Sequence, residues 1–246
     1  MIERERKTPM GQRIAIFCIA GLMVVSTIAL YISIVISDGN ARREAVAAEE
    51  AMERFEEKMG IHDAAMEQQR LELSARYFEK FNGFRSEVRA FNAEAVTELR
   101  TRDLVVGEGR EIGEGDFNYA AFYIGFLPDE TIFDSSLNEA SLQNPLPGSP
   151  NMIEGWAQGL VGMRIGGVRE ITIPWELGYG AQGAGDTIPG MTPLRFIVML
   201  IEPPAEILFP AGTIDACTIA YWHQFGEIFG SEEATREFCE SMIREE

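Results

Sequence analysis

Six aromatic or aliphatic residues and one acid stand next to turns in the central part of the sequence and form its strongest candidate site. They are Tyr123, Phe133, Ile153, Trp156, Tyr179 and Phe196, with Asp134 as the acid. Such side chains can line an apolar recess that binds a ligand with few hydrogen bonds. Any one of them alone is more often a core residue. The sequence contains no G-x-S-x-G, H-E-x-x-H or P-loop pattern, so it offers no nucleophile, zinc or phosphate motif.

The composition excludes further classes of function. The chain has 246 residues, of which 39 are acidic and 21 basic, and its net charge is −18. This charge argues against nucleic acid as a partner. The three Cys and two His residues are too widely spaced for a zinc cluster, so no metal is expected. Its 46% of hydrophobic and 24% of charged residues are typical of a globular protein.

Four stretches between residues 103 and 202 follow the pattern of one family. They read AAFYIGFLPDETIFDSS at 120–136, MIEGWAQGLVGMRIGGVREITIP at 152–174, LGYGAQG at 177–183 and IPGMTPLRFIVML at 188–200. In these stretches the sequence resembles the FKBP-type peptidyl-prolyl cis-trans isomerases. The resemblance implies an α+β fold, with a twisted antiparallel sheet wrapped around a short helix and a shallow pocket between them. It also implies isomerase activity on Pro-containing polypeptide segments, without a cofactor.

By this resemblance, the aromatic residues would hold the proline ring of a substrate. Trp156 would form the floor of the pocket, and its walls would be Tyr123, Phe133, Ile153 and Phe196. Rotation about a peptide bond has a barrier of about 18–20 kcal/mol because of its partial double bond. An apolar pocket removes the water that stabilises the planar amide. Complementarity to the twisted amide would then lower the barrier without a nucleophile, metal or cofactor.

The resemblance places four further residues around the substrate chain. The Tyr179 hydroxyl would donate to a substrate carbonyl, and Asp134 would lie beside the carbonyl of the twisted imide. Ile188 would line the rim, and the backbone of Met152 would face the substrate.

Several positions depart from the family pattern. Glu139 stands where a basic partner of the acid is common. Gln143 and Pro145 stand where aromatic residues are common, and the loop after Tyr179 lacks its usual aromatic or His. A non-catalytic binding module or holdase for Pro-containing segments therefore stays an alternative.

Residues 14–36 form a largely apolar stretch near the N-terminus, with Ser26, Thr27 and Ser33 as its polar residues. The stretch has 23 residues and no charge, and as a helix it would span roughly 34 Å, against about 30 Å for a bilayer core. It is longer than the apolar region of a cleaved signal peptide. The basic tail of residues 1–13 is predicted to be cytoplasmic by the positive-inside rule. The sequence therefore predicts a single-pass transmembrane anchor with an extracytoplasmic C-terminal domain.

Residues 38–102 are predicted to form a helical stalk, broken near Gly60. Apolar residues recur there at helical spacing. They are Ala48, Met52, Phe55 and Met59, and then Phe81, Phe84, Val88, Phe91 and Ala95. The apolar face is predicted to pack on the C-terminal domain of the same chain. The alternative is a coiled-coil homodimer through the stalk.

The segment 103–202 is predicted to be the isomerase domain. Its glycines separate short apolar runs, as in a mostly antiparallel sheet. The runs predict strands over 119–126, 168–173 and 194–201, with one helix over 153–163.

Residues 205–246 are predicted to form a helical hairpin. Its helices cover 213–229 and 232–244. Ser231 suits the N-cap of the second helix. Cys217 and Cys239 are expected to form a disulfide worth roughly 3 kcal/mol in an oxidising space, or else to be two buried thiols. A further interpretation makes the stalk and this hairpin the functional parts, with the middle domain as a scaffold.

Overall fold

The computed structural model describes residues 39–245, which form two compact units. The first unit contains residues up to His62 together with Leu208–Glu246, and the second is Asp63–Ile207. Helix α2, Gly39–Asn82, begins in the first unit and ends in the second. The two units are therefore described separately below.

The predicted anchor over 14–36 and the predicted cytoplasmic tail over 1–13 lie outside the described residues. Within the described part of the chain, no helix combines the length and the apolar character that crossing a membrane requires. The described residues therefore leave the anchor as a prediction.

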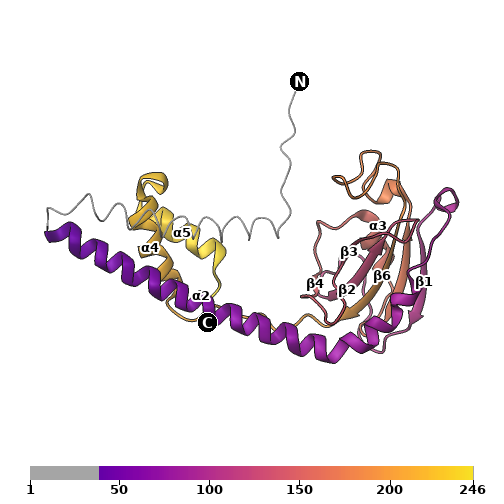
Figure 1. Ribbon diagram of the computed structural model, residues 1–246, viewed down its shortest axis with the longest axis horizontal. Coiled ribbons are helices and arrows are strands. Elements are labelled where there is room, and N and C mark those ends of the chain that lie inside the picture. Colours follow the sequence, from indigo (N-terminus) through magenta and orange to yellow (C-terminus); the bar gives the residue numbers. More distant parts are fainter. Residues whose placement is uncertain (1–38, 246) are drawn as a thin grey trace, which may run out of the picture. The chain divides into compact units, whose positions relative to one another are not determined.

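The second unit is built on a six-stranded antiparallel sheet in the order β1-β5-β6-β2-β3, with β4 paired to β2. The strands are β1 (Arg100–Val105), β2 (Ala120–Phe126), β3 (Ile132–Ser135), β4 (Leu146–Pro147), β5 (Val168–Ile173) and β6 (Leu194–Ile201). Helix α3, Glu154–Leu160, accompanies the sheet (Figure 1). The predicted α+β class and the three predicted strands are confirmed. The other strands were not predicted because β1 is largely polar and β3 and β4 are very short.

The inner face of the sheet packs closely on α3. A Cβ atom at Gly155 would lie 2.2 Å from Cγ2 of Ile173, and one at Gly159 would lie 2.5 Å from Cγ2 of Ile171. Real side chains do not approach so closely, so the two glycines allow the helix to lie directly on β5. This contact fixes the position of Trp156, which follows Gly155 in the helix.

The outer face of the same sheet is covered by the second half of α2. Phe81 is fully buried, and its ring centroid lies 6.4 Å from that of Phe122 on β2. The ring centroid of Tyr77 lies 5.9 Å from the same phenylalanine. Leu73 and Phe78 pack against this cluster as well. The helix therefore packs on its own domain, as the first of the two stalk predictions has it.

The predicted stalk over 38–102 is wrong in two respects. Helix α2 runs through Gly60 without a break, since one glycine costs only about 1 kcal/mol in a helix and this helix has 44 residues. The helix also ends at Asn82, where a 3₁₀ turn over Gly83–Glu87 follows. Apolar residues beyond α2 pack on the outer face of the sheet: Phe84, Val88 and Phe91. The spacing of these residues therefore reflects contact with a sheet and not the face of a helix. In addition, β1 begins at Arg100, inside the predicted stalk.

The first unit combines the start of α2 with a hairpin of α4, Thr213–Phe229, and α5, Glu232–Met242. The Ser231 hydroxyl accepts a hydrogen bond of 3.1 Å from the backbone N–H of Ala234, as its predicted role as N-cap requires. Gly230 caps the end of α4 and has a φ of +77°, a conformation that favours glycine.

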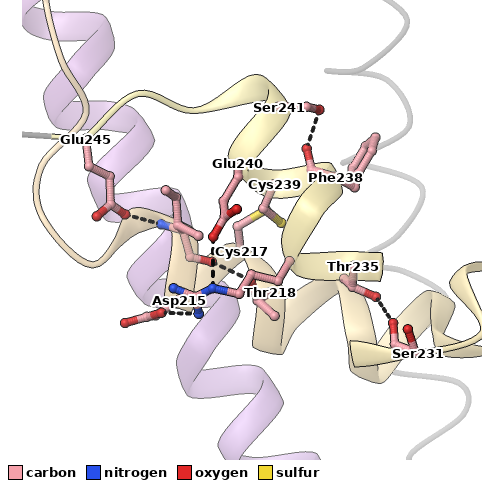
Figure 2. The surroundings of a disulfide bond; sticks show 12 residues. Asp215, Cys217, Thr218, Ser231, Thr235, Phe238, Cys239, Glu240, Ser241 and Glu245 are labelled. Carbon is pink, nitrogen blue, oxygen red and sulfur yellow. Dashed lines mark hydrogen bonds and ion pairs between the residues drawn. A yellow bond between two sulfur atoms is a disulfide. The ribbon is translucent and has the colours of Figure 1, made fainter. Parts of the chain in front are cut away.

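A disulfide joins Cys217 of α4 to Cys239 of α5 (Figure 2). Both cysteines are fully buried, and Phe55 of α2 and Ile243 pack in the same cluster. Figure 2 also shows the hydrogen bond of 3.1 Å from the Thr235 hydroxyl to the backbone carbonyl at the start of α5. The disulfide therefore lies at the centre of the small core of this unit.

Replacing both cysteines with alanine is expected to lower the free energy of unfolding of the helical unit by about 3 kcal/mol. The physical reason is that the bridge joins residues 22 positions apart, and without it the unfolded chain gains entropy. Guanidinium unfolding followed by circular dichroism measures the change. Dithiothreitol should cause the same loss in the wild type and none in the Cys217→Ala/Cys239→Ala variant. Equal unfolding midpoints of variant and oxidised wild type would contradict the prediction.

Candidate active site

Four of the predicted aromatic residues contact one another on the inner face of the sheet. The ring centroid of Trp156 on α3 lies 5.7 Å from that of Tyr123 on β2 and 5.3 Å from that of Phe196 on β6. Phe133 on β3 adds a contact of 5.5 Å with Phe196. The rings of all three pairs are nearly perpendicular, which is a favourable edge-to-face arrangement. We call these four side chains the ring cluster.

The ring cluster has a buried floor and half-exposed sides. Trp156 is 1% exposed and Phe196 is 5% exposed. Tyr123 and Phe133 are half-buried and pack against the same core. The cluster therefore presents aromatic surface to a ligand above a floor that packing holds rigid.

A hydrogen bond connects the ring cluster to the predicted acid. The Tyr123 hydroxyl donates to Oδ2 of Asp134 at 2.6 Å. Two serines that follow the acid fix the tyrosine backbone: the N–H of Tyr123 donates to Oγ of Ser136 at 2.7 Å, and the Ser135 hydroxyl donates to the Tyr123 carbonyl at 3.2 Å. The F-D-S-S string thus aligns β3 with β2 so that the carboxylate reaches the phenol. Glu139, which departs from the family pattern, is exposed.

Burial and negative charge keep two tyrosine hydroxyls protonated. Burial, then the hydrogen bond and charge of Asp134, hold the pKa of Tyr123 well above its ordinary value. Burial and then the charge of Asp134 also raise the pKa of Tyr179. Since both groups keep their protons beyond pH 10, the site offers hydroxyl donors at neutral pH.

The remaining predicted residues lie around α3 and in the loop before β6. Ile153 precedes α3, and its carbonyl accepts from the N–H of Trp156 at 3.0 Å. Met152 is half-buried and packs against the inner core. Ile188 is 4% exposed and belongs to that core, so it is more enclosed than a rim residue. Tyr179 is 39% exposed and lies outside the ring contacts of the cluster.

Sequence reasoning did not single out Gly125 or Tyr119, which both shape the ring cluster. A Cβ atom at Gly125 would lie 2.7 Å from ring carbons of both Phe133 and Phe196. The hydroxyl of Tyr119 accepts from Nε1 of Trp156 at 3.3 Å. The role of Gly125 could have been predicted from the sequence Tyr123-Ile124-Gly125, because the period of a strand places residues 123 and 125 on one face of the sheet.

Arg169 on β5 was also not predicted, although it anchors the end of α3. Its guanidinium donates to the carbonyls of Gly159 and Val161 at 3.0 and 2.9 Å. It also pairs with Asp103 on β1 at 2.6 Å. This 7% exposed side chain therefore joins two strands to the helix that carries Trp156.

Apolar surface, hydroxyl donors and one carboxylate make up the site. Among residues 39–245, no group of three or more His, Cys, Asp or Glu side chains could hold a metal ion. The arrangement can bind an apolar ring and hydrogen-bond a neighbouring carbonyl.

The comparisons with known proteins agree with this geometry. A sequence model described as FKBP-type peptidyl-prolyl cis-trans isomerase matches residues 109–201. The FK506-binding protein of Neisseria meningitidis (serogroup A) is 42% identical over 104 residues, which cover 42% of this chain and 94% of that protein. The chain belongs to the FKBP-type peptidyl-prolyl cis-trans isomerases.

Other relatives of this isomerase are similar over the same region. The probable FK506-binding protein of Corynebacterium glutamicum is 40% identical over 112 residues, covering 44% of this chain and 89% of that protein. The peptidyl-prolyl cis-trans isomerase FKBP10 of Homo sapiens is 40% identical over 119 residues, covering 48% of this chain and 20% of that protein. The family match includes the ring cluster and α3 but leaves out α2, β1 and the α4–α5 hairpin.

Tyr123→Phe is expected to reduce the alkaline loss of stability of the isomerase. Below about pH 10 this tyrosine is protonated in both the folded and the unfolded chain. Above that pH the unfolded chain releases the proton, whereas the folded chain keeps it because the pKa is raised. The free energy of unfolding therefore falls by up to about 1.4 kcal/mol per pH unit from this group.

Guanidinium unfolding of wild type and Tyr123→Phe at pH 9, 10 and 11 measures this contribution. The variant lacks the ionisable hydroxyl, so its stability should fall less steeply above pH 10. Parallel curves for the two proteins would show that the folded-state pKa is not raised.

Proposed function

We propose that the ring cluster binds the proline ring of a substrate and favours the twisted X–Pro amide over the planar one. The half-buried rings of Tyr123 and Phe133, which lie over the buried floor of Trp156 and Phe196, support this mechanism. Water stabilises the planar, more polar amide, and contact with apolar rings removes that water. A surface complementary to the twisted form lowers the barrier further. Spontaneous isomerisation takes tens to hundreds of seconds, so this acceleration matters for folding.

The polar groups have a supporting role in this mechanism. The Tyr179 hydroxyl donates to a carbonyl of the bound substrate, and its exposure of 39% leaves it within reach of a ligand. The Tyr123 hydroxyl is already engaged by Asp134. The Asp134 carboxylate therefore holds the Tyr123 ring in place. In the proposed mechanism it also lies beside the carbonyl of the substrate that rotates.

Two substitutions of Tyr123 separate the ring from the hydroxyl. Tyr123→Phe keeps the aromatic wall and should keep kcat/KM within about threefold of the wild type, a change of less than about 1 kcal/mol. Tyr123→Ala removes the wall and should lower kcat/KM at least about tenfold. A protease-coupled assay of the full chain on a Leu-Pro tetrapeptide measures both, with Tyr221→Ala in the helical unit as the control. An equal loss in the Phe and Ala variants would assign the effect to the hydroxyl and overturn the apolar mechanism.

We also propose that the isomerase acts on exported or surface proteins, anchored by residues 14–36 with its C-terminal domain outside the cytoplasm. The disulfide between Cys217 and Cys239 supports this location, because such bonds persist in oxidising compartments. The length of the uncharged stretch supports the anchor.

Fractionation of cells that produce the full chain tests the location. The protein should stay with membranes through a carbonate wash, and external protease should digest its C-terminal domain in spheroplasts. A chain lacking residues 1–37 should appear in the soluble fraction. A C-terminal domain that stays protected while an extracytoplasmic marker is digested would overturn the proposed orientation.

A holdase activity is the second candidate function, and one feature of the helical unit favours it. Three apolar side chains of α4 and α5 are exposed: Ile219 by 40%, Ile228 by 78% and Met242 by 43%. We propose that these groups bind unfolded chains, as contiguous exposed apolar patches do. The Tyr123→Ala variant should then still suppress aggregation of a reduced, unfolded client. Aggregation at the rate seen without the protein would exclude the holdase.

A homodimer through α2 stays an alternative proposal. The second half of the helix is occupied by its own sheet, so the first half would have to provide the contact, where Val46 and Ile61 are about half exposed. Sedimentation of a chain lacking residues 1–37 at the mass of one copy would exclude it.

A further inference from the structure

A cavity of about 340 Å³ lies on the outer face of the sheet, apart from the ring cluster. Strands β1, β5 and β6 form its floor, and the segment between α2 and β1 forms its wall. Across the floor, Arg102 pairs in register with Glu170, and Thr172 with Arg195. Successive strand residues point to opposite faces, so Arg195 faces this hollow while Phe196 faces the ring cluster. We call this hollow the outer cavity.

The wall of the outer cavity is held in place by the protein itself. The N–H of Phe91 donates to the carbonyl of Pro128 at 3.0 Å. The N–H of Ala90 donates to Oε1 of Glu130 at 2.9 Å. These bonds fix an apolar surface, to which Val96 also contributes. The cavity is therefore formed before any ligand enters.

The guanidinium of Arg195 is oriented but only partly paired. Its Nε donates to Oγ1 of Thr172 at 3.2 Å, and its Cζ lies 4.2 Å from the ring centroid of Phe91. The nearest carboxylate oxygen, on Glu170, is 3.9 Å from Nη1, too far for a hydrogen bond. Among residues 39–245, the two terminal amino groups thus have no acceptor at hydrogen-bond distance. The side chain is only 20% exposed and lines the outer cavity.

The charges around the outer cavity and the shape of the Arg195 guanidinium favour a carboxylate as the ligand. Arg102 already binds Glu87 at 2.7 Å and Glu170 at 3.1 Å. Glu170 lines the outer cavity together with Arg100, Arg102 and Arg195, so the charged groups of the lining attract an anion. A carboxylate carries one charge and matches the planar fork of a guanidinium with two parallel hydrogen bonds.

We propose that the outer cavity binds a carboxylate carried on a small apolar group. The carboxylate accepts hydrogen bonds from Nη1 and Nη2 of Arg195, and the apolar group lies against Phe91, Ala95 and Val96. Two sources share this chemistry, a free organic acid and the C-terminal residue of a polypeptide. The site is separate from the isomerase site, because the two lie on opposite faces of the sheet.

Fluorine NMR of 4-(trifluoromethyl)benzoate, titrated with the full chain, tests the proposal. The probe should bind the wild type, and Arg195→Met should weaken binding at least tenfold. Glu170→Gln should tighten binding several-fold, because it removes the competing negative charge beside the guanidinium. A variant that merely loosened the fold would not gain affinity. Arg164→Met is the matched control, since that arginine pairs with Glu111 outside the cavity, and it should leave binding unchanged.

Competition with the probe distinguishes the two sources. N-acetyl-Ala-Phe with a free carboxylate should displace the probe, and its C-terminal amide should not. Displacement at a lower concentration than unlabelled benzoate supports a polypeptide as the source, and displacement at a higher concentration supports a free acid. Displacement by the amide would overturn the proposal.

Two further results would overturn it. One is equal binding to Arg195→Met and wild type. The other is displacement of the probe by an uncharged Leu-Pro peptide amide, which would place the probe in the isomerase site. Arg195→Lys keeps the charge without the planar fork and should weaken binding several-fold. The isomerase activity of Arg195→Lys reports whether the fold is retained. The probe-binding test does not depend on the proposed mechanism of the ring cluster, so failure of that mechanism would leave the test unaffected.

Discussion

Gly125→Val is expected to lower kcat/KM of the isomerase about 100-fold, the typical cost of moving a binding group by about 1 Å. The added atoms would enter the space that ring carbons of Phe133 and Phe196 occupy, 2.7 Å from an ideal Cβ. Those rings cannot retreat freely, because Phe196 also contacts Trp156. Overpacking should lower the free energy of unfolding by only about 1–3 kcal/mol. The protease-coupled assay on a Leu-Pro peptide, with thermal unfolding alongside, measures both effects.

Gly113→Val is the matched control for this experiment. A Cβ at Gly113 would meet nothing within 4 Å, and the residue lies in the loop between β1 and β2. The control should keep the wild-type activity. A Gly125→Val enzyme with wild-type kcat/KM would show that the spacing of the two phenylalanine rings does not govern the reaction.

Arg169→Met should lower the free energy of unfolding of the isomerase unit by about 4 kcal/mol. Two backbone carbonyls, of Gly159 and Val161, lose a charged donor, and each such bond is worth about 1.5–3 kcal/mol. The partner carboxylate of Asp103 is 41% exposed and can turn to water, so it adds little. Guanidinium unfolding followed by tryptophan fluorescence, in a Trp222→Phe background that removes the signal of the helical unit, measures the loss.

Arg100→Met provides the comparison at the surface. Its ion pair with Glu98 is more than half exposed on both sides, and such pairs are worth at most about 1 kcal/mol. If Arg169→Met lowered the free energy of unfolding by less than about 1 kcal/mol, the end of α3 would be held by packing on β5 alone.

The sequence predicted the parts of the site that depend on local pattern. Trp156, Tyr123 and Phe196 belong to strings whose order is typical of the family, and the structure places their rings in contact. The strands at 168–173 and 194–201 were predictable because their residues are nearly all buried. The cap at Ser231 was predictable because its hydrogen bond reaches only three residues along the chain.

What the sequence missed depends on contacts between distant segments. Arg169 bonds to Asp103, 66 positions away, and no pattern in the residues between them predicts that ion pair. Phe84 and Phe91 have helical spacing but pack on a sheet, since spacing alone does not say which surface an apolar residue meets. The start of β1, residues 100–102, falls inside the predicted stalk for a similar reason, because its hydrogen bonds come from its partner β5.

The covering of the outer face by α2 means that the region of the family match is smaller than the part of this chain that buries its own apolar surface. A fragment cut at the family limits, residues 109–201, would bare Phe122 and Phe126, which are fully buried in the intact unit. It would also lose the edge strand beside β5. An excised catalytic fragment should therefore start near Asp63 and stop near Ile207, and shorter pieces should precipitate.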